Sequence, residues 1–151
     1  MKTFAVQPLV SVGPVRLGVS RAEVLAALGP CSARFRKLPT SLHPTDAWFG
    51  AGFQVFYTGA DPAVEYIEVS ANSGFVAVPF GHDCFSTPAS LLVATIEKQA
   101  ACDATDPEPG LSYIFPALEL SLWRPTMEKP EGTYFATVGI GVRGYYSKND
   151  A

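Results

Sequence analysis

The fold is decided by the stretch FQVFYTGADPAVEYIEV, residues 53–69, in which apolar and polar side chains alternate on both sides of a short turn. Alternation with a period of two is typical of a strand with one buried face, and two such runs around a turn predict a hairpin. We therefore expect antiparallel strands over residues 53–57 and 64–69, joined by residues 58–62.

A second hairpin is expected nearer the C-terminus. Its strands are residues 118–123 and 133–142, and a Pro-bounded loop, residues 125–132, connects them. Weaker strand candidates are residues 4–10, 32–38, 75–79 and 111–115, whereas residues 43–46 and 103–110 are expected to form loops.

Each hairpin is preceded by a segment with helix signals. Residues 20–30 open with Ser20 and Glu23, a capping box in which the serine hydroxyl accepts from the amide of the third helical residue. Gly29 and Pro30 end this helix, which is too short to be stable alone and must dock on other elements.

The second helix is expected over residues 87–101, with Thr87 as its N-cap and Pro88 as its first helical residue.

The two halves of the chain show similar spacing. From Ser20 to Phe53 is 33 positions, and from Thr87 to Leu120 is also 33. At this offset of 67, Val55 corresponds to Leu122 and Trp48 to Phe115, and an offset of 71 relates Ile67 to Val138 and Val69 to Ile140. We therefore expect one domain, residues 1–151, built of two halves (about 1–80 and 81–151). The predicted fold class is α+β: an antiparallel sheet with two short helices packed on one face, as a tandem pseudo-repeat.

Composition excludes several classes of protein. The 151 residues are 48% hydrophobic and 17% charged, which is too apolar for a disordered tail and too weakly charged for a coiled coil. The net charge of −3 does not favour binding to a phosphate backbone. Arg34, Arg36 and Lys37 form a basic cluster, but no aromatic platform follows them in sequence, so no nucleic-acid partner is predicted.

The sequence shows no recognisable targeting signal, so we expect a cytoplasmic protein. Gln7 and Pro8 interrupt the apolar start, and no run is long enough to span a membrane. The chain has three cysteines, an odd number, which favours reduced and mostly buried thiols. One bridge, Cys31–Cys84 or Cys84–Cys102, stays open as an alternative.

Catalytic and metal motifs are not evident. His82, Asp83 and Cys84 are consecutive, so neighbouring side chains point in opposite directions, and no second cluster completes a metal site. His43 and Asp46 lack an identified nucleophile. We therefore predict no enzyme, no cofactor and no metal. Residues 139–141, Gly-Ile-Gly, indicate a bulge or a close backbone approach within a strand.

Alternation divides the expected strands into two faces. One face is nearly all apolar and should pack against both helices; it comprises Phe53, Val55, Tyr57, Ile67, Val69, Leu118, Leu120, Leu122, Tyr134, Ala136, Val138 and Ile140. The other mixes aromatic rings with carboxylates and hydroxyls; it comprises Gln54, Phe56, Val64, Tyr66, Glu68, Glu119, Ser121, Trp123, Thr133, Phe135 and Thr137.

The mixed face has the composition of a protein interface, where aromatic residues supply most of the binding energy. Its predicted anchors are Phe56, Tyr66, Glu68, Glu119, Trp123 and Phe135. The carboxylates favour a basic protein partner, such as a toxin domain. Two other interpretations stay open: the chain's own loops cover this face, or the face forms a homodimer.

Residues 17–24, LGVSRAEV, followed by Leu28, Gly29 and Pro30, resemble the opening motif L-G-M-S/T-x-x-E-V-x-x-x-L-G-x-P of the OmlA/BamE lipoprotein domain. That domain and the β-lactamase inhibitory protein share a helical entry followed by an antiparallel hairpin, and the inhibitory protein carries two such halves in tandem. The resemblance implies a sheet used as a protein-binding surface. The chain also resembles bacterial immunity proteins, which neutralise a toxin by covering it.

The hypothesis from the sequence is therefore a non-enzymatic, immunity-type inhibitor. The first alternative is a small-ligand-binding or enzymatic protein, in which Tyr113, Tyr145 and Tyr146 with Arg124 or Arg143 line a pocket between the sheet and the loops. The second alternative is a structural homodimer.

Overall fold

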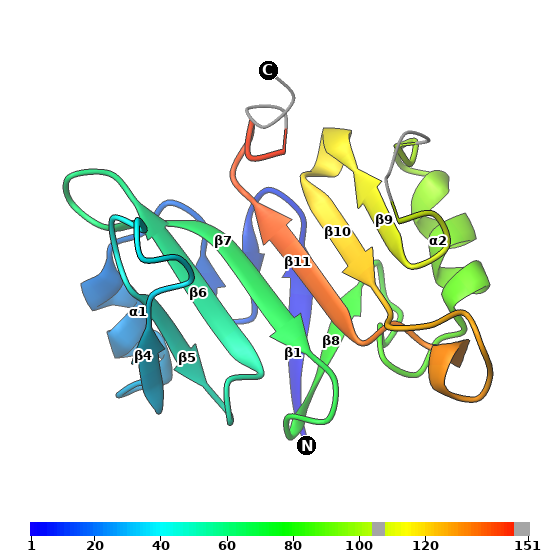
Figure 1. Ribbon diagram of the computed structural model, residues 1–151, viewed down its shortest axis with the longest axis horizontal. Coiled ribbons are helices and arrows are strands. Elements are labelled where there is room, and N and C mark those ends of the chain that lie inside the picture. Colours follow the sequence, from blue (N-terminus) through cyan, green and yellow to red (C-terminus); the bar gives the residue numbers. More distant parts are fainter. Residues whose placement is uncertain (104–107, 147–151) are drawn as a thin grey trace.

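Two β-sheets and two α-helices form the part of the chain described by the structure, a computed structural model that covers residues 1–103 and 108–146 (Figure 1). The elements in chain order are β1 (Lys2–Gln7), β2 (Ser11–Val12), β3 (Val15–Arg16), α1 (Arg21–Leu28), β4 (Ala33–Phe35), β5 (Thr45–Trp48), β6 (Phe53–Thr58), β7 (Ala63–Ser70), β8 (Phe75–Pro79), α2 (Ala89–Glu97), β9 (Ser112–Phe115), η1 (Pro116–Leu118), β10 (Leu120–Trp123), η2 (Glu131–Thr133) and β11 (Thr137–Gly141). The predicted α+β class with mainly antiparallel strands is confirmed.

The large sheet has seven strands in the order β4-β5-β6-β7-β11-β10-β9, all antiparallel to their neighbours. Both predicted hairpins lie within it. Val55 is paired with Ile67 in the first hairpin, and Leu122 with Val138 in the second. The two hairpins meet where β7 pairs with β11 at the centre of the sheet.

Apart from the edge strand β4, the strand order is symmetric about that central pair. Counting outward, β7, β6 and β5 on one side correspond to β11, β10 and β9 on the other. Trp48 pairs with Phe53 in the first half, and Phe115 pairs with Leu120, 67 positions later, in the second. The spacing seen in the sequence thus corresponds to equivalent places in the sheet.

A smaller sheet, in the order β3-β2-β1-β8, lies behind the large one in Figure 1. Strand β1 runs parallel to β8, and one of these two strands precedes each helix. The sequence predicted β1 and β8 as strands without assigning them a sheet, and it missed β2 and β3, which have two residues each and therefore show no periodicity.

Helix α1 has the predicted cap: the Ser20 hydroxyl accepts from the Glu23 amide at 3.3 Å. Its C-cap, Gly29, has a φ of 82°, a conformation that glycine adopts without steric cost. Helix α2 begins one residue later than predicted. Pro88, with extended backbone, is its N-cap, and Thr87 lies outside the helix.

The core lies between the large sheet on one side and the helices and small sheet on the other. It unites the predicted apolar positions of both hairpins with Val24 of α1, Leu92 and Ile96 of α2, and Phe4 and Phe75 of the small sheet. Full burial of one such side chain stabilises the folded state by about 1.5–3 kcal/mol, so burial of these core residues drives folding.

Some predicted face assignments are wrong, and two of them are Val64 and Tyr134. Val64 lies in the core rather than on the mixed face, because a bulge between Phe56 and Tyr57 shifts the register and pairs Val64 with Tyr57. Tyr134 is 41% exposed rather than buried, because β11 begins only at Thr137 and strand alternation does not extend back to it.

The surface loop predicted over residues 43–46 is half right. His43 and Pro44 lie in the loop before β5, whereas Thr45 and Asp46 belong to β5, whose four side chains are all buried. Its sequence, Thr-Asp-Ala-Trp, lacks an apolar run, and the buried Asp46 is tolerated only because charged and polar groups surround it.

Within residues 1–103 and 108–146, the structure contains no helix of the length and apolarity needed to cross a membrane.

Candidate functional site: the hollow face of the large sheet

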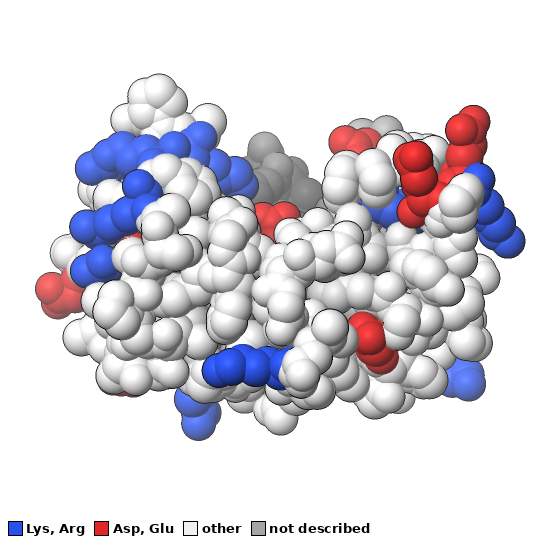
Figure 2. Space-filling model, turned by 90° about the horizontal axis from the view of Figure 1, so that it is seen from below, with Lys and Arg blue, Asp and Glu red and all other residues white. Residues whose placement is uncertain are grey.

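The side of the large sheet that faces away from the core carries polar and aromatic residues. We call it the hollow face, and it comprises Gln54, Phe56, Tyr66, Glu68, Ser121, Trp123 and Thr137. Figure 1 shows it from the front, and Figure 2 shows it as a depression between two raised ends, along the upper edge of that view.

Trp123 is the most exposed aromatic side chain on this face, at 40%. Phe56 is half-buried on the same side of the sheet, so the register places both rings on one face. This agrees with the sequence prediction for these two residues. Glu68 is also on this face and half-buried.

The centre of the hollow face is covered by the chain itself. Tyr66 is 7% exposed because the ring of Tyr145 stacks on it with centroids 4.5 Å apart. Its hydroxyl shares a 3.0 Å hydrogen bond with Ser121 and accepts another, also 3.0 Å, from the Tyr146 hydroxyl. Tyr66 is therefore on the predicted face but is not free to contact a partner.

Glu119 holds that cover in place. Its two carboxylate oxygens accept from the backbone amides of Gly144 at 2.7 Å and Tyr146 at 2.9 Å. The side chain is 5% exposed and follows η1 in a left-handed conformation, with a φ of 48°. The predicted exposure of Glu119 is wrong: its charge is used to pin the turn over residues 141–146.

Phe135 does not lie on the hollow face. It is 1% exposed and packs edge-on against Tyr113, with the guanidinium of Arg124 5.7 Å from its ring centroid. Tyr113 pairs with Leu122, a core residue, so Phe135 belongs to the core side. The predicted position of Phe135 is wrong because the backbone before Thr137 is not a strand.

Burial affects the acidity of the groups on this face. It raises the pKa of Glu68, and the positive charge of Lys37 opposes that shift. Burial also raises the pKa of Tyr66, of Tyr145 and of Tyr146, so these phenols keep their protons to a higher pH than an exposed tyrosine does.

The end of the molecule that bears β4 is basic. Arg34, Arg36 and Lys37 are exposed on β4 and on the loop that follows it, and Figure 2 shows blue side chains gathered there. Arg34 is paired with Asp46, and Arg36 donates to the Ser41 carbonyl, so each of these two cations has a partner within the chain.

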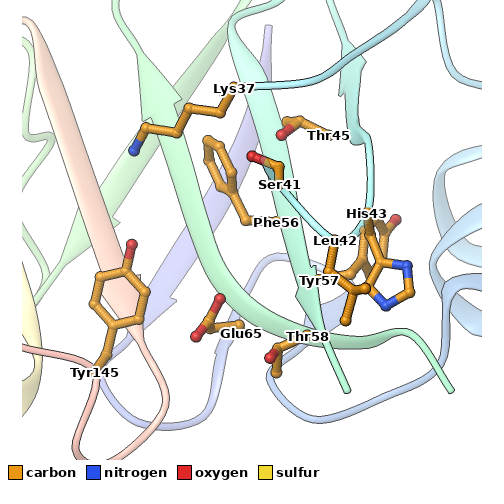
Figure 3. Close-up of a pocket in the computed structure, with 10 residues that line it drawn as sticks. All are labelled: Lys37, Ser41, Leu42, His43, Thr45, Phe56, Tyr57, Thr58, Glu65 and Tyr145. Carbon is orange, nitrogen blue, oxygen red and sulfur yellow. The ribbon is translucent and has the colours of Figure 1, made fainter. Parts of the chain in front are cut away.

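A pocket of about 260 Å³ opens beside Phe56, where the loop after β4 faces the hollow face (Figure 3). It is lined by Lys37, Ser41, Leu42, His43, Thr45, Phe56, Tyr57, Thr58, Glu65 and Tyr145. The His43 ring is fixed by its Nε2, which lies 2.6 Å from the Gly59 carbonyl oxygen. The lining thus combines aromatic rings with groups of both charges.

The sequence did not predict this pocket, because it joins residues from four separate segments. Lys37 reaches Phe56 across β5, and the first two residues of β5 were predicted to belong to a loop. The basic cluster therefore does have an aromatic partner, which comes from β6 rather than from its own segment.

Asp46 is fully buried on β5 and is the centre of a second polar cluster. Arg21 of α1 donates to it through Nε at 2.7 Å, and the Tyr57 hydroxyl donates at 2.7 Å. Arg34 lies 3.3 Å from it, and the Cys31 thiol 3.7 Å. The hydrogen bond to Asp46 raises the pKa of Arg21, and burial followed by the bond to Asp46 raises that of Tyr57. The cluster ties α1 and β4 to the sheet.

The residues of the alternative pocket predicted from the sequence do not line a single pocket. Tyr145 lines the pocket beside Phe56, whereas Tyr113 lines a second one, of about 250 Å³, beside α2. Arg124 donates to the carbonyls of Gly110 and Gly132.

Reactive and metal-ligating side chains are dispersed. All three cysteines belong to the described residues and are free thiols, with Cys84 buried. Asp83 caps its own loop by accepting from the Phe85 amide and the Ser86 hydroxyl. Among the described residues, no three histidine, cysteine or carboxylate side chains are grouped as a metal site would require.

Comparison with known proteins identified no relative: no family model, no curated protein and no solved structure matches the chain.

Proposed function

We propose that this chain is a non-enzymatic, protein-binding inhibitor of the immunity type, which neutralises a toxin by covering it with the hollow face. The observation that carries the proposal is the pair Trp123 and Phe56, one exposed and one half-buried aromatic ring on the same side of a sheet whose other side is the core. Accessible aromatic side chains in a depression are typical of binding hot spots.

Charge on the hollow face supports a basic partner. Glu68 is retained on the sheet although burial disfavours its ionised form. Glu65 lines the pocket at the edge of the same face. A carboxylate that costs stability is expected where it serves recognition. Glu119 and Phe135 have no part in this surface, so the proposed contact residues are Phe56, Glu68 and Trp123.

The experiment is a binding measurement with Trp123→Ala. The partner is the protein retained by the immobilised chain, or the product of a neighbouring toxin gene, and its affinity is measured by calorimetry. We expect Trp123→Ala to weaken binding by about 2 kcal/mol or more, roughly 30-fold. Its melting temperature should change little, because the side chain is 40% exposed.

The matched control is Leu91→Ala, which removes an exposed apolar side chain from α2, outside the hollow face. It should leave affinity unchanged. Equal binding by wild type and Trp123→Ala would contradict the use of the hollow face. Binding without protection of cells that express the partner would contradict the immunity role alone.

A second candidate function, small-ligand binding, is favoured by the pocket beside Phe56. A thermal-shift screen with metabolites tests it, and a stabilisation abolished by Tyr145→Ala would support it. The alternative of a homodimer is tested by light scattering at micromolar concentration, where a monomer would contradict it.

A further inference from the structure

Lys37 already occupies one part of the proposed binding surface. Its ammonium lies 5.1 Å from the centroid of the Phe56 ring, a distance at which a cation is attracted to an aromatic face. The residue is exposed and belongs to the loop between β4 and β5. Figure 3 shows its side chain extended over the ring at the mouth of the pocket.

The surroundings of that ammonium suit a cation in general. The pocket is also lined by the ring of Tyr145 and by the carboxylate of Glu65, which Figure 3 shows between Tyr145 and Phe56. Phe56 packs on Tyr66 at 5.7 Å, and Tyr66 stacks on Tyr145, so the rings form one continuous platform. Aromatic faces and carboxylates together stabilise positive charge.

Lys37 is held there by its contact with the Phe56 ring and by attraction to the charge of Glu68, without a close ion pair in the part of the chain that the structure describes. Among the described residues the ion pairs within 4.0 Å are those of Asp46 with Arg21 and Arg34, so Lys37 is not part of one. A cation–π contact at an exposed site changes an equilibrium only about two- to fivefold. A competing basic group can therefore displace it.

We infer that the pocket beside Phe56 receives an arginine side chain of the protein partner, and that Lys37 occupies this cation site while the partner is absent. This inference rests on the proposed protein-binding function. A guanidinium fits the chemistry better than an ammonium, because its flat face stacks on aromatic rings such as those that line this pocket. The pocket volume of about 260 Å³ leaves room beside the Lys37 ammonium.

The test uses the blocked peptide acetyl-Gly-Arg-Gly-amide as the probe and the same peptide with neutral citrulline as its control. Binding to the full chain is followed by NMR at the ring resonances of Phe56 and Tyr145. We expect the arginine peptide to shift both sets of resonances and the citrulline peptide to leave them unchanged.

Substitutions then identify the site. Lys37→Gln removes the internal competitor and should strengthen binding of the arginine peptide about two- to fivefold. Glu65→Gln and Phe56→Leu should each weaken it. Lys98→Gln, which removes an exposed lysine at the end of α2, should have no effect.

Several results would overturn the inference. Equal binding of the arginine and citrulline peptides would exclude a cation site, and unchanged affinity in Lys37→Gln would exclude Lys37 as its internal occupant. Free arginine could also bind more tightly than the peptide. If the difference exceeded about tenfold, it would be larger than one lost contact explains, and the pocket would be assigned to a free amino acid. Because the peptides contact only this pocket, these outcomes are independent of the effect of Trp123→Ala on the partner, which tests the proposed function.

Discussion

At the scale of single residues, Asp46 shows how a polar group is accommodated in the core. Its carboxylate is fully buried yet accepts from Arg21 and Tyr57, with Arg34 and Cys31 close by. These partners come from helix α1, from the neighbouring strands β4 and β6, and from the connection between α1 and β4. The carboxylate therefore fixes the position of α1 relative to the edge of the large sheet.

We expect Asp46→Asn to lower the free energy of unfolding by about 2 kcal/mol, the value of a hydrogen bond to a charged group. The loss should stay below that of a fully buried ion pair, because the side chains of Arg21 and Arg34 are 30% and 45% exposed and can be rehydrated. Urea unfolding checks this, with Asp61→Asn, at an exposed position, as the control. Equal urea midpoints for wild type and Asp46→Asn would show that the cluster adds no stability.

At the scale of elements, β11 determines how the hollow face is covered. Gly139 and Gly141 leave space for two tyrosines: a Cβ on Gly139 would overlap the Tyr66 hydroxyl, and one on Gly141 would lie 2.6 Å from Cβ and Cγ of Tyr145. The Gly-Ile-Gly pattern thus marks a close approach, one of the two meanings predicted for it. Small residues in a central strand permit the turn after β11 to lie against the sheet.

Gly141→Ala should therefore displace Tyr145 from its stack on Tyr66. Overpacking of this kind costs about 1–3 kcal/mol. The melting temperature should fall, and the near-ultraviolet circular dichroism of the stacked tyrosines should decrease with it. An alanine variant with unchanged melting and an unchanged spectrum would show that the turn adapts without leaving the sheet.

At the scale of the whole molecule, buried phenols link folding to pH. Burial is the main cause of the raised pKa of four of the six tyrosines, namely Tyr57, Tyr66, Tyr145 and Tyr146. Below about pH 10, these groups are protonated in both states and favour neither. Above it, the unfolded chain releases protons that the folded chain retains, so unfolding becomes more favourable.

We therefore expect the free energy of unfolding to fall above about pH 10. Each retained proton contributes about 1.4 kcal/mol per pH unit to the slope. Chemical unfolding at a series of alkaline pH values, with tyrosinate absorbance recorded in parallel, checks this. Absorbance that rises for all six tyrosines before any loss of structure would contradict it. Tyr145→Phe should make the slope less steep.

Strand periodicity predicted the architecture where one side of a strand is apolar. Val55 with Ile67 and Leu122 with Val138 were assigned to one buried face, and each pair is formed. Prediction failed where a residue is buried because of partners that are distant in sequence, since the local pattern does not contain them. Strand β5 was missed because its buried Asp46 is compensated only by residues distant in sequence.

The candidate site was predictable in part. Phe56, Glu68 and Trp123 follow from alternation, because neighbouring positions on a strand point to opposite sides. Lys37 and Tyr145 do not, since one reaches the face across another strand and the other folds back over it after β11.

The sequence by itself determined the two hairpins, the short helices before them and the apolar side that drives folding, because these depend on periodicity within contiguous segments. Only the tertiary structure decided which residues of the mixed side are accessible. Glu119 and Tyr66 are withdrawn beneath the C-terminal turn, and Phe135 joins the core. Exposure depends on which distant segment covers a residue, and no local pattern encodes that.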